Sequence, residues 1–256
     1  MKAIVSRVLG MAMAFGLTVP LVPASAGEGA WIELIGDHGL VDWKGPTGNW
    51  LVAGNARPDP ERPNRLLAEP GKGVVINGPT GRTANLVTNE KFGDIDAQFE
   101  FLIPKGSNSG VKFEGLYEIQ IFDSFGVAKP TGAHNGGIYP RAELLPKYRY
   151  LDEGVAPRVN ASRPAGEWQT LDVIFLAPRF DAAGRKIRNA RFEKVVLNGQ
   201  VIHENVEVKT PTGHVWRTKE MPAGPILLQA DHGPVAFRRI RVRRHPPNDS
   251  SNNPGS

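Results

Sequence analysis

Short runs of alternating apolar and polar residues, separated by turn-forming residues, recur along most of this chain. Residues two apart in a strand share a face, so this alternation predicts β-strands. The 29 Gly and 22 Pro residues disfavour long helices, and no window of helical length repeats every 3.6 residues. The predicted fold class is therefore all-β, a jelly-roll β-sandwich of two antiparallel sheets. The predicted strands cover residues 49–53, 73–76, 85–88, 95–103, 110–113, 117–122, 170–175, 192–197, 201–208, 226–230 and 235–242.

One of the turns is specified in detail by its residues. Asn198-Gly199 separates two alternating runs, and this dipeptide favours the type I′ turn of a two-residue hairpin. We therefore expect residues 192–197 and 201–208 to pair as neighbouring antiparallel strands.

Five arginines lie between residues 238 and 244. Alternation in a strand would point Arg239, Arg241 and Arg243 outward, with Ile240 and Val242 inward. Outward cations suit an edge or terminal strand, because they discourage pairing with other chains. This interpretation is favoured over nucleic-acid binding, so no nucleic-acid partner is expected.

Residues 1–26 have the three parts of a secretory signal peptide. Lys2 and Arg7 supply positive charge, residues 8–22 are apolar, and Ala24-Ser25-Ala26 gives a small-x-small cleavage site. The rest of the chain has no stretch that could span a bilayer, and it has no cysteine. We expect an exported protein, periplasmic or extracellular, with a disordered polar tail over residues 246–256.

The run 117–122 carries a carboxylate and an amide on one face. Glu118 and Gln120 are two residues apart, so they point to the same side of the strand. Such a face normally meets water or a ligand, and an acid beside an amide suits a sugar. An ordinary solvated strand face explains the same pattern. Asp123 would fall on the opposite face from Glu118, unless a bulge intervenes.

The loop before this run decides what lies beside Glu118. A two-residue turn at Gly115-Leu116 would place Phe113 there, whereas a three-residue loop would bring Lys112 to the same face as the carboxylate. The sequence leaves both registers open.

Residues 128–164 form a long stretch rich in Gly, Pro, Asn and Tyr, with little periodicity. Loops of this length in a compact domain are usually functional or disordered, and this one is too aromatic for a flexible linker. We interpret it as an ordered loop that covers one end or face of the sheet. His134 and Tyr139 could then approach the face of Glu118.

A series of motifs along the chain resembles, in the same order, the bacterial 3-keto-disaccharide hydrolase domain family. The sandwich of this family is similar to that of concanavalin A and the laminarinase-type glucanases, and the resemblance implies one such domain over residues 27–245. The family usually has Asn where Arg239 stands, a departure that leaves the fold prediction unchanged. The motifs lie at residues 50–54, 92–94, 107–111, 117–123, 136–139, 166–169, 196–199, 224–229 and 232–240.

The resemblance implies action on a glycoside whose C3 hydroxyl has already been oxidised to a ketone. The ketone acidifies the C2 hydrogen, so a base can remove it and the glycosidic oxygen on C1 can leave by elimination. Water can then add back, which gives a net hydrolysis. This route needs a general base, a group that stabilises the enolate oxygen and a proton donor. It does not need the paired carboxylates of an ordinary glycosidase.

With this chemistry in view, Glu118, His232 and His134 are the candidate catalytic residues, and Glu118 is the first choice for the base. A carbohydrate substrate is the expected partner. The alternative is a non-catalytic, lectin-like carbohydrate-binding module, because the same sandwich serves both functions. The candidate substrate-binding residues are Gln120, Gln229, Asn108, Lys112, Tyr139 and Asp123.

No metal site is predicted from the histidines. The six histidines are scattered, without His-x-His or His-x-x-x-His spacing, and no cofactor is expected. Some related enzymes of keto-sugar elimination use a divalent metal ion. A metal site assembled from distant residues therefore stays open.

Overall fold

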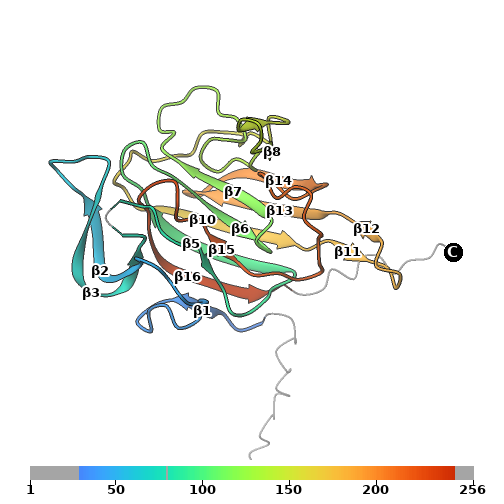
Figure 1. Cartoon of the computed structure of the whole chain (residues 1–256), viewed down its shortest axis with the longest axis horizontal. Coiled ribbons are helices and arrows are strands. Elements are labelled where there is room, and N and C mark those ends of the chain that lie inside the picture. The colour runs from blue at the N-terminus through green and yellow to red at the C-terminus, as the bar shows by residue number, and fades with distance from the viewer. Residues whose placement is uncertain (1–28, 79, 246–256) are drawn as a thin grey trace, which may run out of the picture.

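Two antiparallel sheets, stacked in two layers, form the framework of the protein (Figure 1). The computed structural model describes residues 29–78 and 80–245, so the predicted signal peptide and the predicted tail lie outside the described residues. Strands, turns and irregular segments account for all of the described chain. The predicted all-β sandwich is therefore confirmed.

The larger sheet has eight strands, and the smaller sheet has four. In the larger sheet the order is β14 (Gln200–Val208), β13 (Ala190–Leu197), β10 (Gln169–Leu176), β5 (Ile95–Leu102), β16 (Ala236–Arg244), β3 (Leu66–Ile76) and β2 (Leu51–Pro58), with β1 (Ile32–Ile35) also paired to β16. In the smaller sheet the order is β4 (Leu86–Val87), β15 (Leu227–Leu228), β6 (Asn108–Phe113) and β7 (Tyr117–Phe122). Two short ribbons complete the fold, β8 (Ala142–Glu143) with β9 (Arg149–Tyr150) and β11 (Arg179–Phe180) with β12 (Lys186–Arg188).

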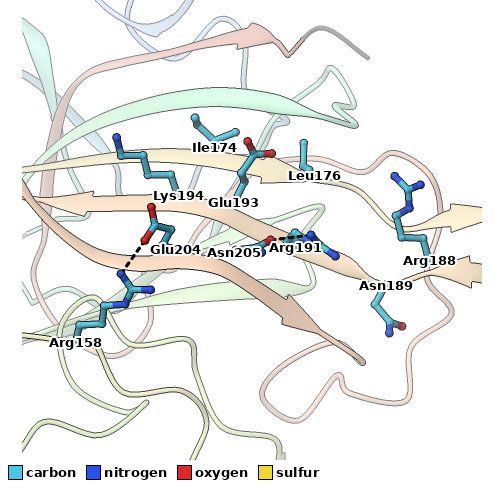
Figure 2. Close-up of a pocket in the computed structure, with 10 residues that line it drawn as sticks. All are labelled: Arg158, Ile174, Leu176, Arg188, Asn189, Arg191, Glu193, Lys194, Glu204 and Asn205. Carbon is cyan, nitrogen blue, oxygen red and sulfur yellow. Dashed lines mark hydrogen bonds and ion pairs between the residues drawn. The ribbon is translucent and has the colours of Figure 1, made fainter. Parts of the chain in front are cut away.

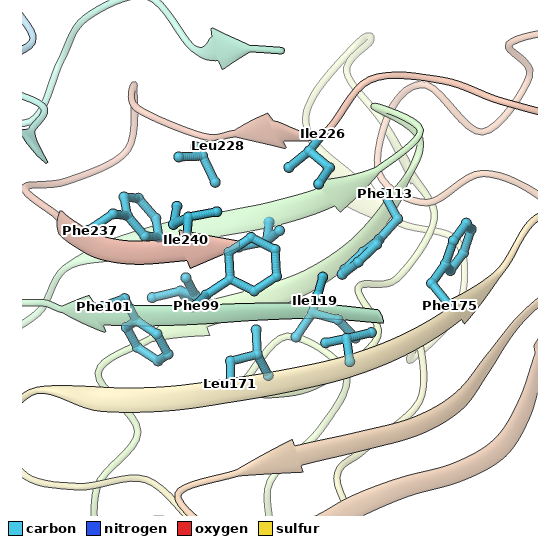
Figure 3. Packing of buried hydrophobic residues seen from close by; sticks show 14 of the residues in the cluster. Phe99, Phe101, Phe113, Ile119, Leu171, Phe175, Ile226, Leu228, Phe237 and Ile240 are labelled. Carbon is cyan, nitrogen blue, oxygen red and sulfur yellow. The ribbon is translucent and has the colours of Figure 1, made fainter. Parts of the chain in front are cut away.

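Aromatic side chains from both sheets meet in the core between them (Figure 3). Phe113 of β6 packs against Phe175 of β10 and Phe192 of β13, with ring centroids 5.1 and 5.4 Å apart. Phe99 of β5 meets the same ring edge to face at 6.1 Å. Burial of each such ring contributes about 1.5–3 kcal/mol, so these contacts hold the two sheets together. Trp50, which directly precedes β2, also lies in this core.

Every predicted run contains a strand of the structure. Asn198 and Gly199 have φ values of 51° and 80°, and β13 pairs with β14 as the type I′ hairpin requires. β1 and the short strands of the two ribbons were not predicted, because their two to four residues do not stand out as strand-like runs in the sequence.

The arginine-rich strand β16 was predicted as an edge or terminal strand, and it is the last strand of the described chain but does not lie at an edge of the sheet. It lies between β5 and β3, and β1 pairs with it as well. Its outward arginines form ion pairs across the sheet, Arg238 and Arg239 with Glu100, and Arg243 with Asp96. These arginines therefore neutralise acidic side chains on the outer face of β5, and they do not protect an edge strand from pairing with other chains.

No helix in residues 29–78 and 80–245 is long and apolar enough to span a membrane.

Candidate active site

The β6–β7 hairpin has the three-residue loop, which settles the register. Phe113 pairs with Tyr117, and Lys112 pairs with Glu118 without any bulge between them. Cross-strand partners point to the same side of a sheet, so the ammonium group of Lys112 and the carboxylate of Glu118 share one face. The apolar neighbours of this pair, Val111 and Ile119, point into the core.

The outer face of this hairpin is buried, and not solvated as a simple strand face would be. Glu118 and Gln120 are each only 2% exposed. Two segments distant in sequence cover them. Residues 136–139 run along the free edge of β7, where Tyr139 N donates to Glu118 O at 3.0 Å. From the second segment, Thr212 Oγ1 accepts a hydrogen bond from Glu118 N at 3.0 Å.

Lys112 and Glu118 form a buried ion pair, with Nζ 3.1 Å from Oε2. Burial raises the pKa of Glu118, while the charge and hydrogen bond of Lys112 act in the opposite direction. A carboxylate with a raised pKa is a stronger base than an ordinary Glu, provided that it is ionised. Lys112 favours this ionised form, so Glu118 can be both ionised and more basic than an exposed Glu.

Two glycines leave room around the carboxylate. A Cβ on Gly110 would lie 2.3 Å from Glu118 Oε1, so the Glu118 side chain lies directly over this glycine. A Cβ on Gly213 would lie 3.9 Å from Glu118 Oε2, 3.9 Å from the Tyr139 ring and 4.0 Å from Lys112 Nζ. Three functional side chains therefore converge around Gly213.

Gln120 offers an unused acceptor beside Glu118. Its Nε2 donates to Asn108 Oδ1 at 3.2 Å and more weakly to Ala133 O at 3.4 Å. Its Oε1 is buried and has no hydrogen-bond partner among the described residues. Buried polar atoms are nearly always paired, so this oxygen suits a hydroxyl of a ligand.

His232 comes from the segment that follows β15. Its Nδ1 lies 2.6 Å from Asp231 Oδ1, which holds the ring so that Nε2 is available for proton transfer. The charges of His232 and Asp231 both act on the pKa of Glu118, His232 lowering it and Asp231 raising it. Gln229 precedes this turn, and its N donates to Gly110 O at 2.9 Å.

The other predicted residues have well-defined local partners. His134 Nδ1 accepts from Thr131 N at 3.0 Å, so in the neutral ring Nε2 carries the proton. The His134 ring also packs edge to face against Phe122, at the far end of β7 from Glu118. Asp123 Oδ2 accepts from Gly106 N at 2.9 Å, which fixes the turn before β6.

The predicted covering loop also carries a cluster of three tyrosines. Tyr139 Oη lies 2.9 Å from Tyr148 Oη and 3.1 Å from Tyr150 Oη. Burial raises the pKa of Tyr148, and the charge of Glu118 adds to this effect. Burial, followed by the charge of Lys112, lowers the pKa of His214. Sequence reasoning missed Tyr148, Tyr150 and His214 as site residues, since no strand pattern orients them.

The sequence matches the profile of the 3-keto-alpha-glucoside-1,2-lyase-like domain over residues 30–243. The chain belongs to this family. A search of curated proteins gives no match.

Solved structures resemble this lyase-like domain at low sequence identity. A proposed glycosyl hydrolase from Parabacteroides distasonis ATCC 8503 is 22% identical, with 84% of this chain and 83% of that chain covered and a TM-score of 0.61. A second protein of the same description and organism is 19% identical, with 76% and 98% covered and a TM-score of 0.47. The carbohydrate-binding module CBM66 from Bacillus subtilis is 11% identical, with 76% and 95% covered and a TM-score of 0.34. The first of these likenesses supports the sandwich fold.

The described part of this lyase-like domain does not provide a metal site. No group of three or more His, Asp or Glu side chains in residues 29–78 and 80–245 is placed to hold a metal ion. The donor set of these residues therefore does not fit the divalent ion used by some enzymes of keto-sugar elimination.

The lyase-like domain also has a groove of about 1020 Å³ on the outer face of the larger sheet (Figure 2). It runs over β10, β13 and β14, and it contains none of the predicted site residues. Several of its charged groups are paired, Arg158 with Glu204 and Arg191 with Asn205. The groove lacks a buried base, so the candidate active site remains the face of the smaller sheet.

Proposed function

We propose that this protein is an exported enzyme, periplasmic or extracellular, that cleaves 3-keto-glycosides. The reaction begins with removal of the C2 proton, continues with elimination of the glycosidic oxygen from C1, and ends in net hydrolysis when water adds back. Membership of the 3-keto-alpha-glucoside-1,2-lyase-like family supports the substrate class.

The observation that carries this proposal is the buried Lys112–Glu118 pair. A C2 hydrogen beside a ketone is a weak acid, and its removal needs a desolvated carboxylate of raised pKa. Glu118 has such an environment, and its partner is an ammonium group instead of a second carboxylate. A glycosidase that proceeds through an oxocarbenium ion would pair two carboxylates, so this site favours elimination.

His232 is the proton donor to the leaving oxygen in this scheme. Its ring is oriented by Asp231, and its charge reaches Glu118. When water adds to C1, the same imidazole takes the proton of the water, and Glu118 returns its proton to C2. His134, whose Nε2 carries a proton in the neutral ring, is the reserve candidate for either step.

Polar side chains around the base would hold the sugar hydroxyls. Gln120 contributes the unused Oε1, and Asn108 orients the amide that carries it. Gln229 lies partly exposed beside Gly110. Amides both donate and accept, which suits adjacent hydroxyl groups of a pyranose ring.

The test is an assay with two nitrophenyl glucosides, one carrying a ketone at C3 and the other the ordinary hydroxyl. Release of nitrophenol from the keto-glucoside alone supports the proposal, because only this substrate has an acidic C2 hydrogen. Cleavage of both substrates at similar rates would contradict it. Binding of both without any release would instead favour the lectin-like carbohydrate-binding module.

A further inference from the structure

We propose that the cluster of Tyr139, Tyr148 and Tyr150 stabilises the enolate oxygen, with Tyr148 as the hydrogen-bond donor. This inference rests on the proposed function. Glu118 is the base and His232 is the proton donor there, so the group that stabilises the enolate oxygen is still to be assigned. An elimination through C2 places negative charge on the C3 oxygen, and preorganised donors aimed at this oxygen lower the barrier.

The layout of the smaller sheet places the cluster on the required side of the base. The strand order is β15, β6 and β7, and residues 136–139 continue along the free edge of β7. His232 follows β15, so it lies on the β6 side of Glu118, whereas Tyr139 lies on the opposite side. In the substrate, C1 and C3 likewise flank C2. A ring with C2 at Glu118 can therefore direct C1 toward His232 and C3 toward the tyrosines.

A proton count shows that the cluster can donate outward. Three phenols carry three hydroxyl protons, and the contacts Tyr139–Tyr148 and Tyr139–Tyr150 use two of them. One proton remains for a ligand. In a relay that runs from Tyr150 through Tyr139 to Tyr148, the free proton belongs to Tyr148.

Burial and the charge of Glu118 raise the pKa of Tyr148, so its hydroxyl keeps its proton. Either oxygen can donate in the Tyr139–Tyr148 contact, and the arrangement in which Tyr139 donates leaves the Tyr148 proton free. A phenol that receives a hydrogen bond becomes a better donor, because bonds in such chains strengthen one another. Tyr148 is also 45% exposed, so a ligand can reach it.

The proton and electron balance of the enolisation is complete within these groups. The C2 proton moves to the Glu118 carboxylate, the C2–H electron pair forms the C2=C3 bond, and the carbonyl pair moves onto the C3 oxygen beside Tyr148. On collapse the ketone re-forms, a C1=C2 bond forms, and the C1–O bond breaks. The leaving oxygen then takes a proton from His232.

The test separates enolisation from cleavage. The probe is a 3-keto-glucose analogue with hydrogen in place of the leaving group at C1, incubated in D₂O while NMR follows loss of the C2–H signal. Wild-type protein should exchange this hydrogen. Tyr148→Phe should slow the exchange by about a hundredfold or more, the usual loss for one oxyanion donor. Tyr150→Phe is the matched control at the start of the relay, and its exchange rate should fall by less than about tenfold.

His232→Gln separates enolisation from protonation of the leaving oxygen. This variant should still exchange the C2 hydrogen, but it should no longer cleave the nitrophenyl keto-glucoside. Binding of the probe to Tyr148→Phe should stay within about threefold of wild type, because a neutral ketone accepts a weaker bond than an enolate. Exchange by Tyr148→Phe at nearly the wild-type rate would overturn the inference, as would loss of wild-type exchange on treatment with a chelator. A wild-type protein that neither exchanges nor cleaves would contradict the proposed function itself.

Discussion

The proposed reaction at the candidate site depends on a single carboxylate, that of Glu118, as the base. Burial opposes its charge, and one ammonium group 3.1 Å away supports it. This balance is sensitive, because removal of one partner leaves the other charge buried and unpaired. Substitutions at or beside Glu118 should therefore lower stability as well as turnover, so each variant needs both measurements.

Glu118→Gln should lower kcat by about a hundredfold or more, because the amide keeps the shape but cannot accept the C2 proton. The keto-glucoside assay measures the loss, and a thermal melt verifies the fold. Glu204→Gln, which makes the same change in the surface pair with Arg158, is the matched control and should retain activity. A loss below tenfold in Glu118→Gln would move the base to His232 or His134.

Gly110→Ala should reduce turnover through the position of Glu118 alone. The new Cβ would lie 2.3 Å from Glu118 Oε1, so the carboxylate must move away from its place beside Lys112. We expect kcat to fall by at least about tenfold, since small misplacements of a catalytic group are costly. Gly45→Ala is the control, because a Cβ there meets nothing within 4 Å. Equal activity of the two variants would show that Glu118 tolerates displacement.

At the level of the element, the β6–β7 hairpin contains a second buried carboxyl group. Glu114 lies in its three-residue loop with a φ of 56°, and neither of its oxygens has a partner among the described residues. Burial, followed by the charges of Glu220 and Asp94, raises the pKa of Glu114 from 4.5 to about 8. The folded state therefore holds this proton more tightly than the unfolded chain does.

Protonation of Glu114 should make the stability of the hairpin depend on pH. Its contribution is fully present below the unfolded pKa of 4.5 and is lost as pH rises through the folded pKa of about 8. Glu114→Gln removes this dependence, so its Tm should exceed that of wild type by about 3–8 °C at pH 9 and match it near pH 4.5. Thermal melts across this range provide the measurement. Parallel curves for the two proteins would show that folding does not raise the pKa of Glu114.

Strands of six or more residues and the β13–β14 hairpin could be predicted from the sequence, whereas the other neighbours in the larger sheet and the segments that bury Glu118 could not. Alternation predicts which side chains of β10 are buried, and Asn198-Gly199 predicts a tight turn. Both are local features, and the structure shows both. Alternation does not say which strand lies alongside, so the arginines of β16 suggested an edge or terminal strand, although β16 lies between β5 and β3. Burial of Glu118 also escaped prediction, because Tyr139 and Thr212 reach it from other parts of the chain.

At the scale of the whole molecule, the larger sheet depends on its last strand. β16 pairs with β1, β3 and β5, so a chain that ends before Ala236 leaves three strands without a shared neighbour. It also loses Phe237 and Ile240 from the core. Such a chain should show no cooperative unfolding in urea, and added peptide covering residues 235–245 should restore the transition. A cooperative transition in the truncated chain alone would contradict this.

Because β16 comes last among the strands in sequence, the sandwich can be completed only after β16 has been synthesised. Synthesis proceeds from the N-terminus, so β1, β3 and β5 leave the ribosome long before the strand that joins them. Pairings between distant segments are slow to form, and they cannot form at all before both partners have been made. The growing chain therefore remains without a finished larger sheet until β16 has been made. A polypeptide in this condition can still be threaded through a narrow translocation channel, whereas a folded sandwich cannot.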